Sequence, residues 1–179
     1  MIQTRTCLYL LLLLPGLAVL NACNTVAGPY KAYEGPVLTD DQVALLEGAR
    51  FLRTDWINRL NDSIRFMSVD GRPIDYAERF SAIHVAPGVH DITVYFSWDM
   101  GSQRGLAPAL VTYAANRNTM NRTLRVTVEA GKTYIVKGDP VFLGKRRDIT
   151  SLQYVDFWIE DEAGNTVVSR KDGAYIASP

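Results

Sequence analysis

The sequence predicts an all-β fold, and within that class an antiparallel β-sandwich, for residues 38–179. Apolar and polar residues alternate in several segments of this region, which is the pattern of strands that are buried on one face. Turn signals built on glycine or proline separate these segments at intervals of roughly ten residues, a spacing typical of sandwiches and barrels. We favour the sandwich. We expect a single domain, because 47% of the residues are hydrophobic and 21% are charged.

The clearest strand signal covers residues 80–98. The side chains on one face of its second half are His90, Ile92, Val94, Phe96 and Trp98. Ala86-Pro87-Gly88 supplies a turn, because proline presets one turn dihedral and glycine accepts a positive one. We therefore expect a β-hairpin. An even-membered loop places Ile83 opposite Ile92 and Val85 opposite His90, so that both strands present their apolar residues to one side.

Shorter signals precede this hairpin. Residues 39–42 have the arrangement of a capping box and predict one helical turn from Asp40, whereas the apolar residues 43–46 fit either that turn or a first strand. The apolar residues of 56–60 have helical spacing, and a connecting loop fits them equally well.

Residues 64–69 predict a strand that ends in the tight turn Asp70-Gly71. Pro73 limits the strand that follows to an edge position or a short piece, because proline cannot donate a hydrogen bond to a neighbour. Beyond residue 98, we expect polar loops at 100–106 and 116–121 on either side of an extended segment at 109–114.

Two further hairpins are predicted toward the C-terminus. Apolar residues alternate over 124–128, and a three-residue loop with Gly131 in the left-handed conformation would pair Val126 with Tyr134. The same register pairs Leu124 with Val136. A last hairpin joins 154–160 to 166–170 through Ala163-Gly164-Asn165, after a charged loop at 145–148.

The N-terminal residues 1–22 have the order of a secretory signal. Arg5 is their one charge, the apolar run 8–14 follows, and small residues come last. The run is too short for a stable transmembrane helix, and a retained anchor is the alternative that we disfavour. Residues 23–37 contain several glycines and prolines without periodicity, so we expect them to form a tether.

Leu20-Asn21-Ala22-Cys23 resembles the lipobox of bacterial lipoproteins, although Asn21 is less usual there than alanine or serine. The resemblance implies cleavage before Cys23, a diacylglycerol on its thiol and an acyl chain such as palmitate on its amino group. Acyl chains contribute about 0.8 kcal/mol per buried methylene, so anchoring would be permanent. Asn24 follows the cysteine where enteric-type lipoproteins retained in the inner membrane have aspartate. The resemblance therefore implies the outer membrane, facing the periplasm.

Composition excludes several classes of function. The chain has 19 basic and 19 acidic residues, so removal of Arg5 with the signal leaves a net charge of −1 and no general attraction to nucleic acid. The second cysteine, Cys7, lies inside the signal, so a processed chain would have neither a disulfide nor a thiol nucleophile. About 150 remaining residues are enough to bury a stable core.

Motifs along the mature chain resemble those of a group of uncharacterised proteobacterial lipoproteins whose core is similar to PEGA-type β-sandwich domains, with an immunoglobulin-like architecture. The motifs follow the lipobox and are short and rich in turn residues: 33–36 with 43–44, 69–71, 86–90 and 129–134. The resemblance spans most of the mature chain. It implies no catalytic residue and no cofactor.

No residue pattern indicates catalysis. The two histidines, His84 and His90, are expected on opposite faces of the first hairpin, with His84 facing Asp91, so they cannot share a metal ion. There is no Gly-x-Ser-x-Gly elbow, and residues 131–133 imitate a phosphate loop without its first glycine. The acidic groups 40–41, Asp148 and 160–162 have no spacing that indicates a glycosidase or a calcium site.

Basic and aromatic residues on the loops predict a binding surface instead. The aromatic candidates are Trp56, Trp98 and Tyr113, and Lys145 adds to the charge; the candidate arginines are Arg104, Arg117, Arg122, Arg146 and Arg147. We therefore expect a non-enzymatic, lipid-anchored envelope protein that binds an envelope protein or peptidoglycan. The alternatives are a glycan-acting hydrolase that uses acidic residues and a purely structural spacer.

Overall fold

A computed structural model describes residues 28–55, 58–99, 119–145, 147 and 149–176. Almost all of the regular structure in these residues is β-strand, which confirms the all-β class. In chain order the elements are β1 (Tyr30–Lys31), η1 (Asp40–Gln42), β2 (Ala44–Gly48), β3 (Arg50–Asp55), β4 (Asn58–Val69), β5 (Arg72–Pro73), η2 (Ala77–Arg79), β6 (Ala82–Val85), β7 (Gly88–Ser97), β8 (Asn121–Val128), β9 (Thr133–Phe142), β10 (Leu152–Asp161) and β11 (Thr166–Val168).

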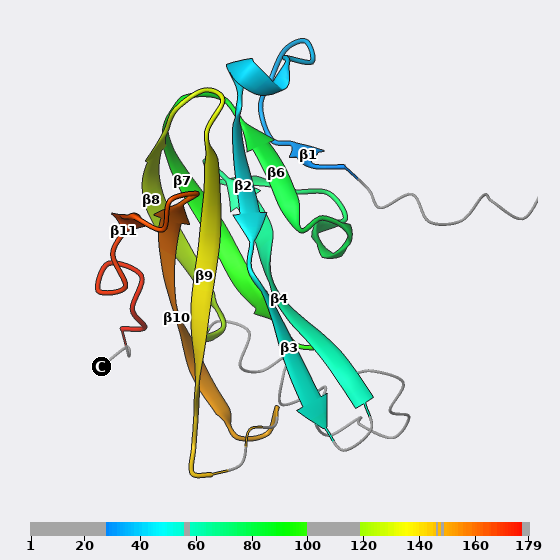
Figure 1. Cartoon of the computed structure of the whole chain (residues 1–179), viewed down its shortest axis with the longest axis vertical. Helices are drawn as coiled ribbons and strands as arrows, with labels where there is room; N and C mark the ends of the chain where they lie inside the picture. Colours follow the sequence, from blue (N-terminus) through cyan, green and yellow to red (C-terminus); the bar gives the residue numbers. More distant parts are fainter. Residues whose placement is uncertain (1–27, 56–57, 100–118, 146, 148, 177–179) are drawn as a thin grey trace, which may run out of the picture.

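The strands form two sheets (Figure 1). One sheet has the order β1-β6-β2-β9-β10-β11 and is mixed, because β1 pairs with β6 in parallel and β2 pairs with β9 in parallel. The other sheet has the order β3-β4-β7-β8, with β5 beside β4, and all its pairs are antiparallel. The expectation of purely antiparallel pairing is therefore wrong for the first sheet.

The core lies between the apolar faces of the two sheets. On β7 the side chains of Ile92, Val94 and Phe96 are buried and alternate with partly exposed residues, as the sequence pattern predicts. Leu46 and Phe157 contribute to the same core cluster from the mixed sheet. The alternation of the strands therefore assigned the buried face correctly.

The chain passes from one sheet to the other at Gly48 and Ala49. The Ala49 N–H donates to the Val136 carbonyl at 2.9 Å in the mixed sheet, and the Ala49 carbonyl accepts from the Ile64 N–H at 2.9 Å in the antiparallel sheet. A Cβ atom on Gly48 would lie 2.0 Å from the Ile64 carbonyl oxygen. Only glycine fits this corner, from which β3 continues away from β9 (Figure 1).

The hairpin predicted for residues 80–98 is wrong, because its two strands belong to different sheets. Ile83 of β6 lies opposite Leu46 of β2, whereas Ile92 of β7 lies opposite Val69 of β4 and Leu124 of β8. The connection through 86–87 is an arch that spans the core. The alternation of apolar residues cannot distinguish a hairpin within one sheet from an arch between two sheets. Strands on opposite sides of a core also turn their apolar residues toward each other.

The hairpin predicted for residues 124–136 is wrong for the same reason. β8 pairs with β7, and β9 pairs with β2 and β10, so Val126 and Tyr134 are not partners. Gly131 does have the predicted left-handed conformation, with φ +68°. Its N–H donates to the Val43 carbonyl at 2.7 Å, which fixes this second arch against the start of β2.

Local turn predictions are confirmed. The turn Asp70-Gly71 joins β4 to the short strand β5, with Val69 opposite Arg72. The last hairpin pairs β10 with β11, and Gly164 in its turn has φ +82°. The helical turn η1 begins at Asp40, and the apolar residues after it belong to the strand β2 rather than to a longer helix.

Two segments differ from their expected local structure. Within the stretch 56–60, residues 56–57 lie outside the described residues, and 58–60 belong to β4, so helix is wrong there. Tyr30 and Lys31, which lie in the expected tether, form β1 on the edge of the mixed sheet. The ring of Tyr30 contacts that of Phe80 with centroids 5.1 Å apart. This contact attaches the segment to the domain.

The residues after β11 cover the side of the molecule between β8 and β10. The Phe157 N–H donates to the Gly173 carbonyl at 3.0 Å, and the Tyr175 N–H donates to the Asp156 carboxylate at 2.8 Å. The rings of Tyr154 and Tyr175 are stacked with centroids 5.0 Å apart. We call residues 169–176 the C-terminal strap.

Candidate functional site

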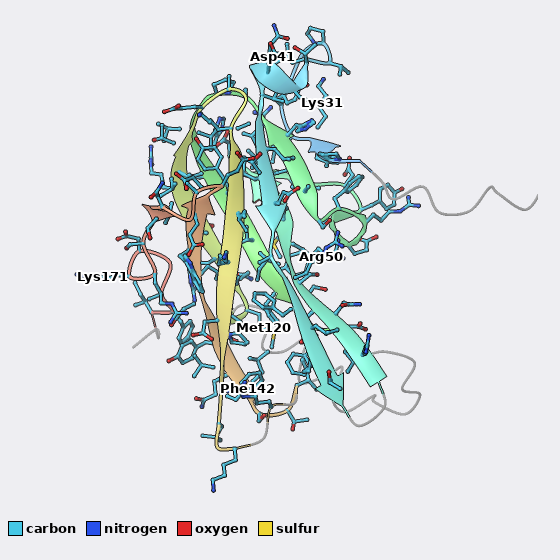
Figure 2. All side chains as sticks on the ribbon, in the orientation of Figure 1. Lys31, Asp41, Arg50, Met120, Phe142 and Lys171 are labelled. Atoms are coloured by element: carbon cyan, nitrogen blue, oxygen red, sulfur yellow. The ribbon has the colours of Figure 1, made fainter. Side chains whose placement is uncertain are left out.

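A large cleft lined by described residues lies where β3 separates from β9. It has a volume of about 840 Å³, and its walls come from both sheets: 51–54 and Asp62 on β3 and β4, Phe96 and Trp98 on and after β7, 138–142 on β9, and Arg147. Figure 2 shows Arg50 near the start of β3 and Phe142 toward the end of β9. The cleft exists because Gly48 and Ala49 redirect the chain while β9 continues beside β10.

Aromatic rings form the floor of this cleft. Phe51 lies 6.0 Å from Phe96, Phe96 lies 6.2 Å from Trp98, and Trp98 lies 5.9 Å from Phe142, measured between ring centroids. Phe96 and Trp98 are 1% and 9% exposed, whereas Phe51 and Phe142 are partly exposed. A ligand in the cleft would therefore meet the rings of Phe51 and Phe142 first, on a base that cannot shift easily.

A partly buried ion pair fixes the β3 wall. The Arg53 guanidinium donates to both carboxylate oxygens of Asp62, at 2.9 and 3.3 Å, and also to the Asp99 carbonyl at 2.8 Å. The Asp99 N–H donates to Asp62 at 2.8 Å. The guanidinium lies 3.9 Å above the Trp98 ring, and the Asp62 side chain is only 4% exposed. These contacts join β3, β4 and the end of β7 into one rigid wall.

The rim of the cleft carries a second carboxylate and a second arginine. Asp139 on β9 forms an ion pair with Arg170 at 2.8 Å. Arg147 is exposed and forms no ion pair or hydrogen bond with another described residue. Of the described cations that line the cleft, Arg147 is therefore the one without a described partner, and its exposed side chain can meet a ligand from outside.

Of the described residues that line the cleft, two carry carboxylates, and arginines engage both: Arg53 pairs with Asp62, and Arg170 pairs with Asp139. A glycosidase needs one carboxyl group that gives a proton and another that attacks or activates water. Either role would require an ion pair to break first. The geometry suits binding of an apolar or planar group with a nearby negative charge better than acid–base chemistry.

The five predicted site arginines do not gather into one patch. Arg147 lines the cleft, and Arg122 lies elsewhere, under the C-terminal strap, with its guanidinium carbon 5.2 Å from the centre of the Tyr175 ring. Arg104, Arg117 and Arg146 lie outside the described residues, as do Trp56 and Tyr113. The lipidation candidate Cys23 also lies outside them.

Arg122 has the environment of a structural residue. Burial lowers the pKa of its guanidinium, and the nearby Asp156 and Tyr175 partly oppose that shift. Its Nε and Nη2 atoms are buried and have no hydrogen-bond partner in the described part of the chain. A ligand approaching from solvent would not reach these atoms.

Sequence reasoning missed Arg53, Asp62 and Phe142. Arg53 and Asp62 lie on the paired strands β3 and β4. The pattern of 56–60 between them fits a helix or a loop, so the sequence does not predict that two paired strands bring these residues together. One signal in the sequence could have identified the ion pair. Phe51 and Arg53 occupy alternate positions, as on one face of a strand, and an arginine on a buried face requires a carboxylate partner.

The histidines are in local structural roles. His90 contacts the Asp70 carboxylate through Nδ1 at 2.7 Å and the Ala86 carbonyl through Nε2 at 2.8 Å. The predicted pairing of His84 with Asp91 is wrong, because His84 lies on β6 of the mixed sheet and Asp91 on β7 of the other. The acidic partner of His84 is Asp40, at 3.9 Å. Among the described residues, no three His, Cys, Asp or Glu side chains are grouped to hold a metal ion.

No protein-family model, curated protein or solved structure matches this chain. In the part of the chain that the structure describes, no helix combines the length and hydropathy needed to cross a membrane.

Proposed function

We propose that this chain is a lipid-anchored, non-enzymatic protein of the bacterial cell envelope, whose domain binds an envelope component in the cleft between β3 and β9. The cleft is the observation that carries the proposal. Partly exposed aromatic rings on a buried aromatic base, beside a cation that has no partner among the described residues, are typical of recognition sites. Its two carboxylates are already paired, which favours binding over hydrolysis.

The proposed localisation rests on the sequence. The apolar run 8–14 and the lipobox at 20–23 support cleavage and acylation at Cys23, and Asn24 supports the outer membrane, with the domain facing the periplasm. The residues between Cys23 and β1 would hold the domain close to the lipid surface. The two sheets around one core are also compatible with a PEGA-like, immunoglobulin-like sandwich, which we propose as the finer fold class.

In-cell photo-cross-linking tests the proposal. A photoreactive residue in place of Leu52, which is 64% exposed beside the cleft, is expected to give a discrete adduct with an envelope protein or peptidoglycan. The matched control is the same residue in place of Val89, which is 56% exposed and does not line the cleft. Equal labelling from both positions, or none from Leu52, would reject binding at the cleft.

The same cells test the address. The wild-type chain should incorporate labelled palmitate and fractionate with the outer membrane, and a Cys23→Ser variant should do neither. Acylation of Cys23→Ser, or an unacylated wild type, would reject the lipid anchor without affecting the conclusion on the cleft.

A further inference from the structure

The free backbone edge of β3 borders the cleft. Among the described residues, β3 is the terminal strand of its sheet and pairs with β4 alone. The Ala49 carbonyl accepts from Ile64, and in an antiparallel ladder the residues that bond to the partner alternate with those that point away. The backbone groups of Arg50, Leu52 and Thr54 therefore face away from β4.

The opposite wall is a strand edge of a different kind. β9 loses its parallel partner after Val136, because β2 ends at the corner. In the described part of the chain, 137–142 therefore pair with β10 alone. Val136 accepts from Ala49, and by the same alternation Pro140 lies on the side that faces away from β10. Proline has no N–H to donate there, so the edge of β9 would pair poorly with a new strand. The edge of β3 has an N–H donor and a carbonyl acceptor at each outward-facing residue.

The side chains around the β3 edge fit an extended peptide. A strand paired with β3 would turn alternate residues toward Phe51 and Phe142 in the cleft, and the others would lie beside Leu52, which is 64% exposed. Arg147 on the rim has no acidic partner among the described residues and complements a carboxylate. A glycan would use the rings but would leave the row of backbone donors and acceptors unpaired.

We propose that the occupant of the cleft is an extended polypeptide segment that pairs with β3 as an additional strand of the antiparallel sheet. Its apolar residues would stand at alternate positions, with an acidic residue near Arg147. This inference rests on the proposed function and names the class of partner. Backbone pairing supplies affinity in this mode of recognition, and the pockets beside the strand supply specificity.

The test uses the acylated full chain in detergent micelles and a pool of short capped peptides in which Val, Ile or Phe alternates with Thr and one end carries Asp. We expect saturable binding by fluorescence anisotropy. Peptides with N-methyl groups on the alternate amides that would donate to β3 keep their side chains and should bind about 30-fold more weakly, the loss expected for two hydrogen bonds. Equal affinity of methylated and unmethylated peptides would overturn strand addition.

Two variants place the peptide on the chain. Arg147→Glu should weaken binding of the Asp-ended pool about ten-fold and should leave binding of an Asn-ended pool nearly unchanged. Arg125→Glu is the matched control, because Arg125 is an exposed arginine on β8 and does not line the cleft. Equal effects of the two variants would overturn the assignment of Arg147.

Other occupants give different results. Soluble muropeptides that bind while the peptide pool does not would keep the proposed cleft and overturn the peptide. Concentration-dependent dimers in sedimentation, abolished by Leu52→Pro, would also overturn the peptide in favour of a second copy paired through β3. Absence of both binding and in-cell adducts at Leu52 would reject the proposed function itself.

Discussion

Asp62 is a carboxylate whose side chain is 4% exposed and whose partners are Arg53 and the Asp99 N–H. Replacing it with alanine leaves the arginine partly buried without its counter-charge, so Asp62→Ala should lower the free energy of unfolding by about 3 kcal/mol. Urea unfolding measures this change. The control is Glu34→Gln, which breaks the exposed ion pair with Arg72 and should cost less than about 1 kcal/mol. Similar losses in both variants would show that burial does not set the strength of the pair.

Asp70 predicts a dependence of stability on pH. Partial burial raises the pKa of its carboxyl, but hydrogen bonds from the Asp91 N–H and His90, with the charges of His90 and Arg72, lower the pKa further, to below the usual 3.8. A depressed folded pKa gives stability that is present above the unfolded value and is lost as pH falls through the folded one.

The Asp70→Asn variant isolates this effect. Asparagine tolerates the left-handed backbone of residue 70, which has φ +51°, so the turn is kept while the charge is removed. The variant should be less stable than the wild type at pH 7, and the difference should shrink in acid below pH 3.8. Asp75→Asn, at an exposed position, is the control. A stability difference that is constant with pH would contradict the assigned role of the carboxylate charge.

Residue patterns identified the buried faces but not the partners of the site. The alternation of β7 and β8 was sufficient to assign which side chains are buried, because that depends only on local periodicity. The contact between Arg53 and Asp62 depends on the register of two paired strands. The local pattern of 56–60 fits a helix or a loop, so it does not predict that pairing. Arg147 was predicted from its charge and its position in an expected loop, which are local properties.

At the scale of elements, Gly48 lies where the chain passes from β2 of the mixed sheet to β3 of the antiparallel sheet. A Cβ atom there would lie 2.0 Å from the Ile64 carbonyl oxygen and 2.8 Å from the carbonyl carbon, and these backbone atoms cannot rotate aside. Gly48→Ala should therefore lower the free energy of unfolding by about 3 kcal/mol or more.

The shape of the cleft should change with that corner. Gly28→Ala, where nothing lies within 4 Å of the new Cβ, is the control and should stay within about 0.5 kcal/mol of the wild type by thermal and urea unfolding. A Gly48→Ala variant as stable as Gly28→Ala would mean that the segment 48–49 adjusts freely and does not fix the divergence of β3 from β9.

Turn chemistry predicted where the chain bends but not which strands then pair. The turns at 70–71 and 163–165 join neighbouring strands, whereas those at 86–88 and 129–131 lead across the core. Both kinds use glycine with positive φ. The difference is set by strands distant in sequence: β2 and β1 occupy the edges of β6, and β4 and β8 occupy those of β7.

At the scale of the molecule, the parallel pairing of β2 with β9 holds the two halves of the chain together. Leu45 lies opposite Thr133 and Gly48 lies opposite Val136, so the pairing joins segments that most of the domain separates. No local pattern encodes such a contact, which is why the mixed sheet was not predicted. Pairing over long separations also slows folding, because the loop must close before the contacts form.

The C-terminal strap packs against β10, which pairs with β9 on the edge away from β2, and against β8 of the other sheet. A Cβ atom on Gly173 would lie 1.9 Å from the Phe157 carbonyl oxygen and 3.1 Å from the Leu124 side chain, so the strap sits tightly against β10 and β8. It also supplies the Phe157–Gly173 and Tyr175–Asp156 hydrogen bonds and the stacked ring of Tyr175. Its removal would expose the core between the two sheets.

Truncation after Ser169 should therefore lower the free energy of unfolding by about 3 kcal/mol or more. Two hydrogen bonds contribute about 1 kcal/mol each and the aromatic pair about as much, and loss of the exposed Arg170–Asp139 ion pair adds less than about 1 kcal/mol. Truncation after Ile176 removes none of these contacts and is the control. Tyr175→Ala should account for about 1 kcal/mol of the loss, because it removes the ring stack and the contact of that ring with Arg122 but leaves the two hydrogen bonds. If truncation after Ser169 leaves stability and the binding of a hydrophobic dye unchanged, the strap does not close the core, and the ladders of the two sheets hold the domain without it.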